Sequence, residues 1–125
     1  MPALPTISII DDDASFRRAA ARLMRSLGHN VASFCSAEEF LQSGLVDNTK
    51  CVISDVQMPG MSGIELQNHL LDRGYTLPII FVTAYPESSA RAQALASGAL
   101  GFFNKTFNEQ DLISCVARAL SQLGT

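Results

Sequence analysis

The nine residues Cys51-Val52-Ile53-Ser54-Asp55-Val56-Gln57-Met58-Pro59 decide the fold of this chain. The small and apolar run from Cys51 to Ser54 predicts a short buried strand, and Met58-Pro59-Gly60 ends it. Asp55 therefore lies where a buried strand passes into a loop. Because the carboxyl ends of parallel strands form ligand sites in α/β proteins, we expect Asp55 to belong to such a site.

Two other segments end in the same way. The apolar run 7–10 leads into Asp11-Asp12-Asp13, and the apolar run 79–82 leads into Thr83. Parallel strands end at one edge of a sheet, so we expect these polar residues to lie close to Asp55. The three strand ends then define a single candidate site.

Composition is typical of one globular domain over residues 1–125. The chain is 47% hydrophobic and 17% charged, and it has no apolar run of the roughly 20 residues that a membrane helix needs. Its start lacks the features of a secretory signal, so we expect a cytoplasmic protein that does not bind membranes. The net charge of −3 argues against nucleic-acid binding by this segment. We expect Cys51 and Cys115 to be small buried hydrophobes.

Strand and helix patterns alternate along the whole chain. Strands are predicted at 7–10, 31–34, 51–54, 78–82 and 100–104, with a polar loop at 45–50. Helices are predicted from Asp13 to Gly28, from a Ser36–Glu39 capping box to Gly44, from a Ser62–Glu65 capping box to about Gly74, over 87–97 with Pro86 in its first turn, and after Asn108. The alternation predicts a flavodoxin-like (βα)5 sandwich of three layers with a parallel sheet of order 2-1-3-4-5. The alanine-rich fourth helix should be poorly buried and the most mobile.

The acidic residues at the strand ends suit a metal ion. Asp11, Asp12 and Asp55 would repel one another unless a cation bound among them. A few oxygen ligands that leave room for water favour Mg²⁺, or Mn²⁺, and the backbone carbonyl of Gln57 could complete the protein ligands.

Two further strand ends provide donors for an anion. Thr83 has a hydroxyl and Lys105 an ammonium, and such groups stabilise the charge of a transferring phosphoryl group. A carboxylate beside a metal ion can be the nucleophile that forms an acyl phosphate. Asp55 is the candidate for this role because it follows the most central strand.

Four motifs in this order resemble the receiver domain of bacterial response regulators, the CheY-like family of two-component signalling. They are Asp11-Asp12, Asp55-Val56-Gln57-Met58-Pro59-Gly60-Met61-Ser62-Gly63, Thr83-Ala84 and Gly98-Ala99-Leu100-Gly101-Phe102-Phe103-Asn104-Lys105. The resemblance covers essentially all 125 residues. It implies that Asp55 accepts a phosphoryl group from a sensor histidine kinase, with Mg²⁺ held by Asp11, Asp12, Asp55 and the Gln57 carbonyl. Catalysis beyond self-phosphorylation and self-dephosphorylation is not implied.

The resemblance also implies a switch. Thr83 and Lys105 would bind phosphoryl oxygens, and Thr83 and Phe102 would change the surface of the fourth helix, fifth strand and fifth helix. Phe102 lacks the hydroxyl of the tyrosine often found at its position. The kinase is expected to dock on the first helix around Arg17, Arg18 and Arg22, and phosphorylation could drive homodimerisation. The motif sequences are most similar to those of transcriptional regulators of the nitrogen-fixation and nitrate-response type, although no DNA-binding segment is present in these 125 residues.

One position departs from the family pattern. Thr106 follows Lys105 where the family usually has proline, often after a cis bond. A cis bond before a non-proline residue costs about 3–4 kcal/mol, so we expect a trans bond or a strained cis one, and the reach of Lys105 is left open. Gln57 and Tyr85 flank the phosphoryl site and would tune its access to water.

Three other functions are compatible with parts of the sequence. A haloacid-dehalogenase-type phosphatase would use Asp11 as nucleophile and Asp13 as acid/base, but it gives Asp55 no role and matches poorly after Lys105. A phosphorylation-inactive interaction module is the second rival, kept open by Thr106. A flavin- or dinucleotide-binding domain is disfavoured because the loop after the first strand is acidic rather than glycine-rich.

Overall fold

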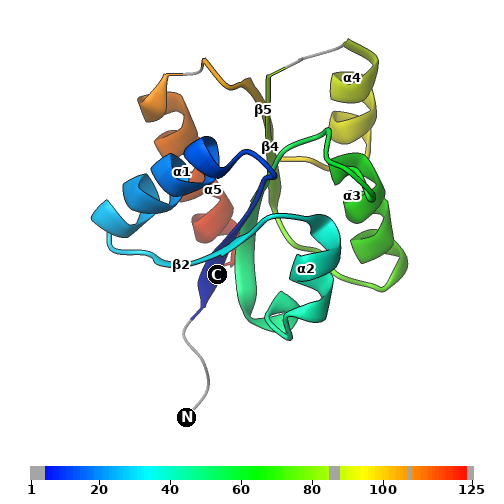
Figure 1. Cartoon of the computed structure of the whole chain (residues 1–125), viewed down its shortest axis with the longest axis horizontal. Helices are drawn as coiled ribbons and strands as arrows, with labels where there is room; N and C mark the ends of the chain where they lie inside the picture. Colours follow the sequence, from blue (N-terminus) through cyan, green and yellow to red (C-terminus); the bar gives the residue numbers. More distant parts are fainter. Residues whose placement is uncertain (1–4, 85–87, 107, 124–125) are drawn as a thin grey trace.

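The computed structural model describes residues 5–84, 88–106 and 108–123, in which strands and helices alternate as predicted (Figure 1). The strands are β1 (Thr6–Ile10), β2 (Asn30–Phe34), β3 (Thr49–Ser54), β4 (Ile79–Thr83) and β5 (Gly101–Asn104). The helices are α1 (Ala14–Ser26), α2 (Ala37–Gln42), α3 (Gly63–Asp72), α4 (Ser88–Ala96) and α5 (Glu109–Leu123), with a short 3-10 helix, η1 (Val46–Asn48).

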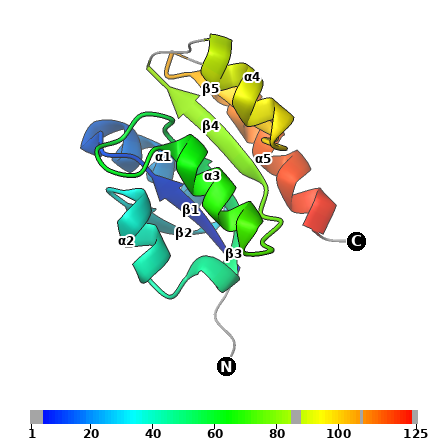
Figure 2. The same ribbon diagram turned by 90° about the vertical axis from the view of Figure 1, so that its right-hand side faces the viewer.

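The five strands form one parallel sheet in the order β2-β1-β3-β4-β5, which confirms the predicted flavodoxin-like topology. Helices α1 and α5 cover one face, and α2, α3 and α4 cover the other (Figure 1). Figure 2 views the second face, with α3 and α4 lying in front of the sheet. A sheet covered on both sides buries its inner strands completely, and every residue of β1 and β4 is buried, including the polar residues Thr6, Ser8 and Thr83.

Side chains from the two faces of the sheet build two separate cores. Ile7 and Ile9 of β1 point into the core beneath α1 and α5, together with Cys51, Cys115 and Leu112. The neighbouring Ile10 joins the core beneath α2, α3 and α4. The burial of Cys51 and Cys115 confirms the prediction made for both, and the third cysteine, Cys35, is exposed.

Helix ends follow the predicted signals with one difference. Gly28, with φ +90°, follows α1 where the helix was expected to stop. The capping box of α3 is complete, because the Ser62 hydroxyl accepts from Glu65 N and the Glu65 carboxylate accepts from Ser62 N. At α2 the Ser36 hydroxyl accepts from Glu39 N, but the Glu39 carboxylate accepts from the preceding Cys35 N instead, so the predicted box is only half formed.

The predicted polar loop at 45–50 is wrong in part. Residues Val46–Asn48 form η1, and β3 begins at Thr49, two residues before the expected start. The hydroxyl of Thr49 is buried but satisfied, since it bonds the Ser8 hydroxyl at 2.8 Å and donates to the Leu45 carbonyl at 2.8 Å. A polar residue can therefore open a buried strand here because its partners come from elsewhere in the chain.

Helix α4 is poorly buried, as expected from its composition. Among its described side chains, from 89 to 96, Ala94 alone is buried, and Leu95 is 42% exposed. Greater mobility of this helix stays a prediction. The expectations for Tyr85 and Pro86, and for a helix start at residue 87, lie outside the described residues. In the described part of the chain, no helix has the length and apolarity to span a membrane.

Gly63, at the start of α3, lies close to the backbone that follows β3. A Cβ built on Gly63 would lie 2.2 Å from the carbonyl oxygen of Asp55 and 2.9 Å from Cε1 of Phe81. Neither neighbour can yield, because one is backbone and the other is a fully buried ring. The start of α3 thus presses against the residue that carries the candidate nucleophile.

We predict that Gly63→Ala lowers the free energy of unfolding by about 1–3 kcal/mol, the usual cost of overpacking. Helix propensity alone would stabilise the variant by about 0.5–1 kcal/mol, so the sign of the change separates the two effects. Urea denaturation followed by circular dichroism measures it. Asn68→Ala, at an exposed position of the same helix, is the control and should change stability little. A stabilised Gly63→Ala protein would contradict the close contact.

Candidate functional site

The backbone of the candidate site continues the hydrogen bonding of the sheet. Asp11, one residue beyond β1, donates its N–H to the Phe34 carbonyl of β2 at 3.0 Å. Asp55, one residue beyond β3, donates its N–H to the Ile10 carbonyl of β1 at 3.0 Å. Both carboxylates therefore project from backbone positions that the sheet ladder fixes.

Lys105 is held in the same way at the end of β5. Its N–H donates to the carbonyl of Thr83, the last residue of β4, at 2.9 Å. No peptide bond among the described residues is cis, so the Lys105–Thr106 bond takes the trans form, one of the two expected outcomes. Thr106 N donates to Asn104 Oδ1 at 3.1 Å, which closes the turn. The lysine side chain still reaches the site, with Nζ 3.2 Å from Asp55 Oδ2.

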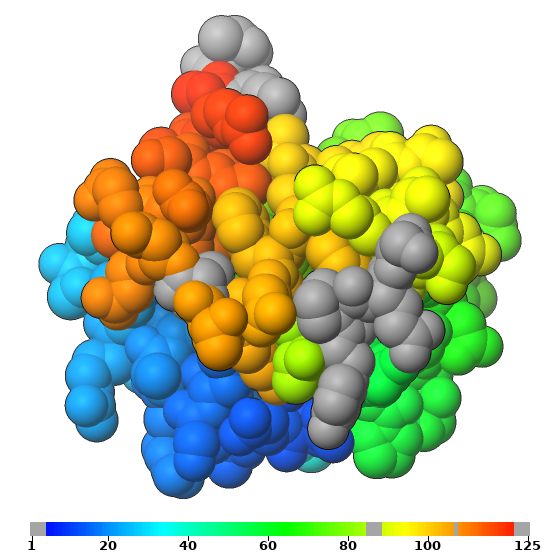
Figure 3. Space-filling view, turned by 90° about the horizontal axis from the view of Figure 1, so that it is seen from above, coloured from blue at the N-terminus to red at the C-terminus, as the bar shows by residue number. Residues whose placement is uncertain are grey.

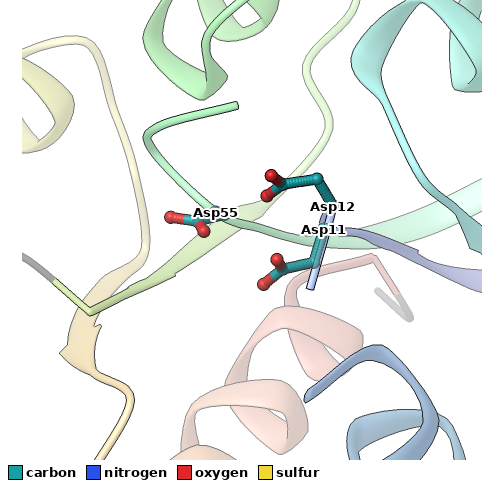
Figure 4. A group of neighbouring side chains, drawn as sticks. All are labelled: Asp11, Asp12 and Asp55. Atoms are coloured by element: carbon teal, nitrogen blue, oxygen red, sulfur yellow. The ribbon is translucent and has the colours of Figure 1, made fainter. Parts of the chain in front are cut away.

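Three carboxylates converge at this edge of the sheet (Figure 4). One oxygen each from Asp11, Asp12 and Asp55 lies within 4.8 Å of the others. Asp11 and Asp55 are buried, whereas Asp12 is exposed. The structure thus brings together the three acidic residues that the sequence predicts as metal ligands, with one side open to solvent.

The ammonium of Lys105 provides the positive charge among these acids. Its Nζ lies 3.0 Å from Asp11 Oδ2, 3.2 Å from Asp55 Oδ2 and 3.5 Å from Asp13 Oδ2. The contact with Asp11 Oδ2 is an ion pair without hydrogen-bond geometry, so this buried oxygen has no hydrogen-bond partner among the described residues. A buried carboxylate oxygen without a hydrogen bond is well suited to coordinate a cation.

Burial and neighbouring charges shift the pKa values of these groups in different directions. Burial raises the pKa of Asp11 from 3.8 to about 6, and the nearby Asp55 charge adds to this, while bonds from Asp13 N and Lys105 oppose it. The hydrogen bond from Phe16 N keeps the pKa of Asp13 below its usual value. Burial alone would lower the pKa of Lys105, but its contacts with Asp11 and Asp55 outweigh burial and raise it.

The residues predicted to form a switch are both buried. Thr83 ends β4 and is 1% exposed. Phe102 is 7% exposed and turns inward, with its ring 6.2 Å from the ring of Phe81. The guanidinium of Arg91 on α4 lies 5.9 Å from the centre of the Phe102 ring. Phe102 therefore connects β5 to α4 from an inward position.

Two more predicted residues lie beside the acids. Gln57 N donates to Asp55 Oδ1 at 3.3 Å, which places the Gln57 backbone next to the candidate nucleophile. Arg17 Nη1 donates to the Asp11 carbonyl at 2.6 Å. The predicted docking residues of α1 share a groove of about 330 Å³, lined by Arg17, Arg18, Ala21, Arg22, Arg25 and Ser33.

Two contacts at the site were not predicted. Asp13 pairs with Lys105, and the ring of Phe16 lies 5.0 Å from Lys105 Nζ. The sequence shows Asp13 as a strand-end acid before a helix, with an acid/base role only in the phosphatase alternative, and Phe16 as an apolar position of that helix. Nothing in either pattern identifies a lysine 89 or more residues further along the chain as the partner.

Comparison with known proteins agrees with this geometry. The family model described as "Response regulator receiver domain" matches residues 7–117. The transcriptional regulatory protein TdiR of Thauera aromatica is 40% identical over 116 residues, which cover 93% of this chain and 51% of that protein. Among solved structures, response regulator StyR is 37% identical with a TM-score of 0.86, covering 96% of this chain and 61% of that one. FixJ-N is 30% identical with a TM-score of 0.81, covering 95% and 94%.

The chain therefore belongs to the family of response-regulator receiver domains. This is a family of phosphoacceptor regulators of two-component systems, and its members generally bind Mg²⁺. Several relatives are named as transcriptional or response regulators. The chain spans about half the length of the curated relatives it matches.

The raised pKa of Asp11 predicts that Asp11→Asn stabilises the metal-free protein at neutral pH. A folded-state pKa above the ordinary value means that ionisation of Asp11 costs stability as the pH rises from about 4 to about 6. The shift from 3.8 to about 6 corresponds to at most about 3 kcal/mol. Urea unfolding in EDTA at several pH values measures this. The free energy of unfolding of the variant should exceed that of wild type above pH 6 and equal it below pH 4.

The exposed neighbour gives the control for this experiment. Asp12→Asn removes the same charge at a solvated position and should change stability much less. An Asp11→Asn protein that is less stable than wild type at neutral pH would mean that the ion pair with Lys105 outweighs the cost of burial.

Proposed function

We propose that Asp55 is the phosphoacceptor of this receiver domain and that it takes a phosphoryl group from a sensor histidine kinase. The observation that carries this proposal is the position of Asp55, buried at the end of the central strand with Lys105 Nζ 3.2 Å from its Oδ2. An ammonium at that distance stabilises the negative charge that develops on the transferring group. Attack by the Asp55 carboxylate on the phosphorus of the kinase's phosphohistidine forms the O–P bond of an acyl phosphate, while the P–N bond breaks and the imidazole leaves.

Asp11, Asp12, Asp55 and the backbone carbonyl of Gln57 are proposed to hold Mg²⁺, or Mn²⁺. Asp11 Oδ2, which accepts no hydrogen bond among the described residues, and the carboxylate oxygens within 4.8 Å of one another suit a hard divalent ion. Such an ion neutralises charge on phosphoryl oxygens and orients them for in-line transfer. The side chains set its position through the sheet ladder that fixes Asp11 and Asp55.

Thr83 and Lys105 are proposed to bind phosphoryl oxygens, and Thr83 and Phe102 to transmit the change. Support comes from the adjacency of these groups, since Lys105 N bonds the Thr83 carbonyl and Phe102 is three residues before the lysine. The ring of Phe102 lies below Arg91 of α4, so a movement of β5 would alter the α4–β5–α5 surface. Because α4 is poorly buried, its movement would break few buried contacts and cost little free energy.

The partners are proposed from the family and from the arginine groove. The groove of Arg17, Arg18 and Arg22 begins next to Asp11 and is suited to docking of the kinase beside the acceptor. Residues 1–125 are proposed to act as one cytoplasmic receiver domain in transcriptional control. This agrees with relatives named as transcriptional regulators. Homodimerisation on phosphorylation stays a prediction.

The phosphatase alternative finds little support at Asp13. An acid/base catalyst needs a pKa near the working pH, but the pKa of Asp13 is held below its usual value. Its Oδ1 accepts from Ser15 N and Phe16 N, and its Oδ2 lies 3.5 Å from Lys105. These contacts keep Asp13 ionised and occupied.

Incubation with acetyl phosphate and Mg²⁺, followed by intact-mass measurement, tests the proposal. We expect one phosphoryl adduct on wild type, labile to hydroxylamine, and none without the metal. Asp55→Asn should remove the adduct because the nucleophilic oxygen is lost, whereas Asp47→Asn, on η1 away from the strand ends, should keep it.

An adduct that survives in the Asp55→Asn protein and disappears in Asp11→Asn would favour the phosphatase alternative. Absence of any adduct on wild type, while Mg²⁺ binding is measurable, would overturn the acceptor role and favour a phosphorylation-inactive interaction module.

A further inference from the structure

We propose that Phe16, on α1, is a positioning residue for Lys105 and keeps its ammonium directed at the acceptor site. This inference rests on the proposed function of Asp55 and Lys105, but it assigns a role to a residue outside the acceptor motifs. Phe16 is the third residue of α1, and its ring centre lies 5.0 Å from Lys105 Nζ. A cation at that distance from a ring face is attracted by the ring electrons.

The first turn of α1 holds the lysine from two sides. Asp13 caps the helix, since its Oδ1 accepts from Ser15 N at 3.0 Å and from Phe16 N at 3.2 Å. The other carboxylate oxygen of Asp13 faces Lys105 Nζ at 3.5 Å. One capping residue therefore fixes the start of the helix, the ring and a carboxylate relative to the ammonium.

This contact joins α1, near the start of the chain, to the segment that follows β5, near its end. Seen from above, the start of α1, in blue, lies directly against the segment that follows β5, in orange (Figure 3). Phe16 and Lys105 line the same groove between α1 and α5, with Ala19, Ala20, Leu23 and Glu109. The lysine is about one-seventh exposed, so its ammonium is partly shielded from water and the attraction to the ring is strengthened.

The Phe16 ring matters because two of the other contacts of Lys105 involve carboxylates that are proposed to take part in binding the metal and the phosphoryl group. Asp11 and Asp55 hold Lys105 in this structure, but they are also the carboxylates proposed to bind the metal and the phosphoryl group. A lysine held by those two alone would have no fixed position once they are engaged. Phe16 on α1 and its capping residue Asp13 lie outside the proposed metal-ligand set, so we expect their contacts to be retained.

A purely structural role for Phe16 makes different predictions. The side chain is half-buried and packs against the core beneath α1 and α5. If packing were its whole contribution, Leu at position 16 would serve nearly as well as an aromatic, and any loss of apolar area on this helix face would have a similar effect. If the ring positions the ammonium, an aromatic residue is required.

The test compares Phe16→Leu, Phe16→Tyr and the control Leu23→Ala, which trims an apolar side chain of the same groove away from the ammonium. The first readout is the proton NMR shift of the Lys105 ε-methylene in metal-free protein. Ring current should move this signal in wild type and in Phe16→Tyr, and the displacement should disappear in Phe16→Leu. The Lys105→Arg variant assigns the signal.

The second readout is the initial rate of phosphoryl uptake from acetyl phosphate at saturating Mg²⁺. We expect Phe16→Leu to be about three- to tenfold slower, the range that a cation–π contact provides. Phe16→Tyr and Leu23→Ala should stay close to wild type. Unchanged uptake in Phe16→Leu, or an equal loss in Leu23→Ala, would overturn the positioning role.

The two readouts separate this inference from the acceptor assignment. If wild type takes up no phosphoryl group, the proposed function fails, and the metal-free NMR experiment still decides the contact. A Lys105 signal without ring-current displacement in wild type would overturn the placement of Phe16. A displacement lost only in Phe16→Leu supports it.

Discussion

The ion pairs of Lys105 are the interaction on which the arrangement of this site depends. Asp11, Asp12 and Asp13 are consecutive acids, and Asp55 adds a fourth at the same sheet edge. Without a counter-charge such a cluster would destabilise the fold. The lysine comes from a strand end 94 residues after Asp11 and 50 residues after Asp55, so the acids become compatible with folding only when β1, β3 and β5 are in place. Site and sheet are therefore assembled together.

The three consecutive aspartates have different surroundings, although the sequence gives them the same side chain. Asp11 is buried, contacts the lysine and retains an oxygen without a hydrogen bond. Asp12 is exposed and lies in the acidic cluster with Asp55. Asp13 caps α1 and faces the lysine. The chain leaves the sheet at Asp11 and enters a helix after Asp13, so each step turns the next carboxylate in a new direction.

Most of the fold was predictable because its signals are local. Continuous apolar runs such as 79–82 indicated covered parallel strands, and Ser62–Glu65 indicated the start of α3. The strand ends also indicated which polar residues would meet. What sequence reasoning missed depends on distant partners. The start of β3 at Thr49 needs the Ser8 hydroxyl, 41 residues away, and the Phe16–Lys105 contact needs the packing of α1 beside β5. The Glu39 carboxylate had two nearby backbone donors, and the choice of Cys35 N depends on loop geometry that no pattern specifies.

The poor burial of α4 affects how the surface of such a protein can change during evolution. Ala94 alone among its described side chains from 89 to 96 is buried, and most of the other positions on that stretch are exposed to solvent. Substitutions at exposed positions of this kind usually change stability by less than about 0.5 kcal/mol. Selection can therefore rewrite the chemistry of this face while the sheet and its acidic edge stay as they are. One scaffold can acquire new recognition surfaces over evolutionary time without passing through unstable intermediates.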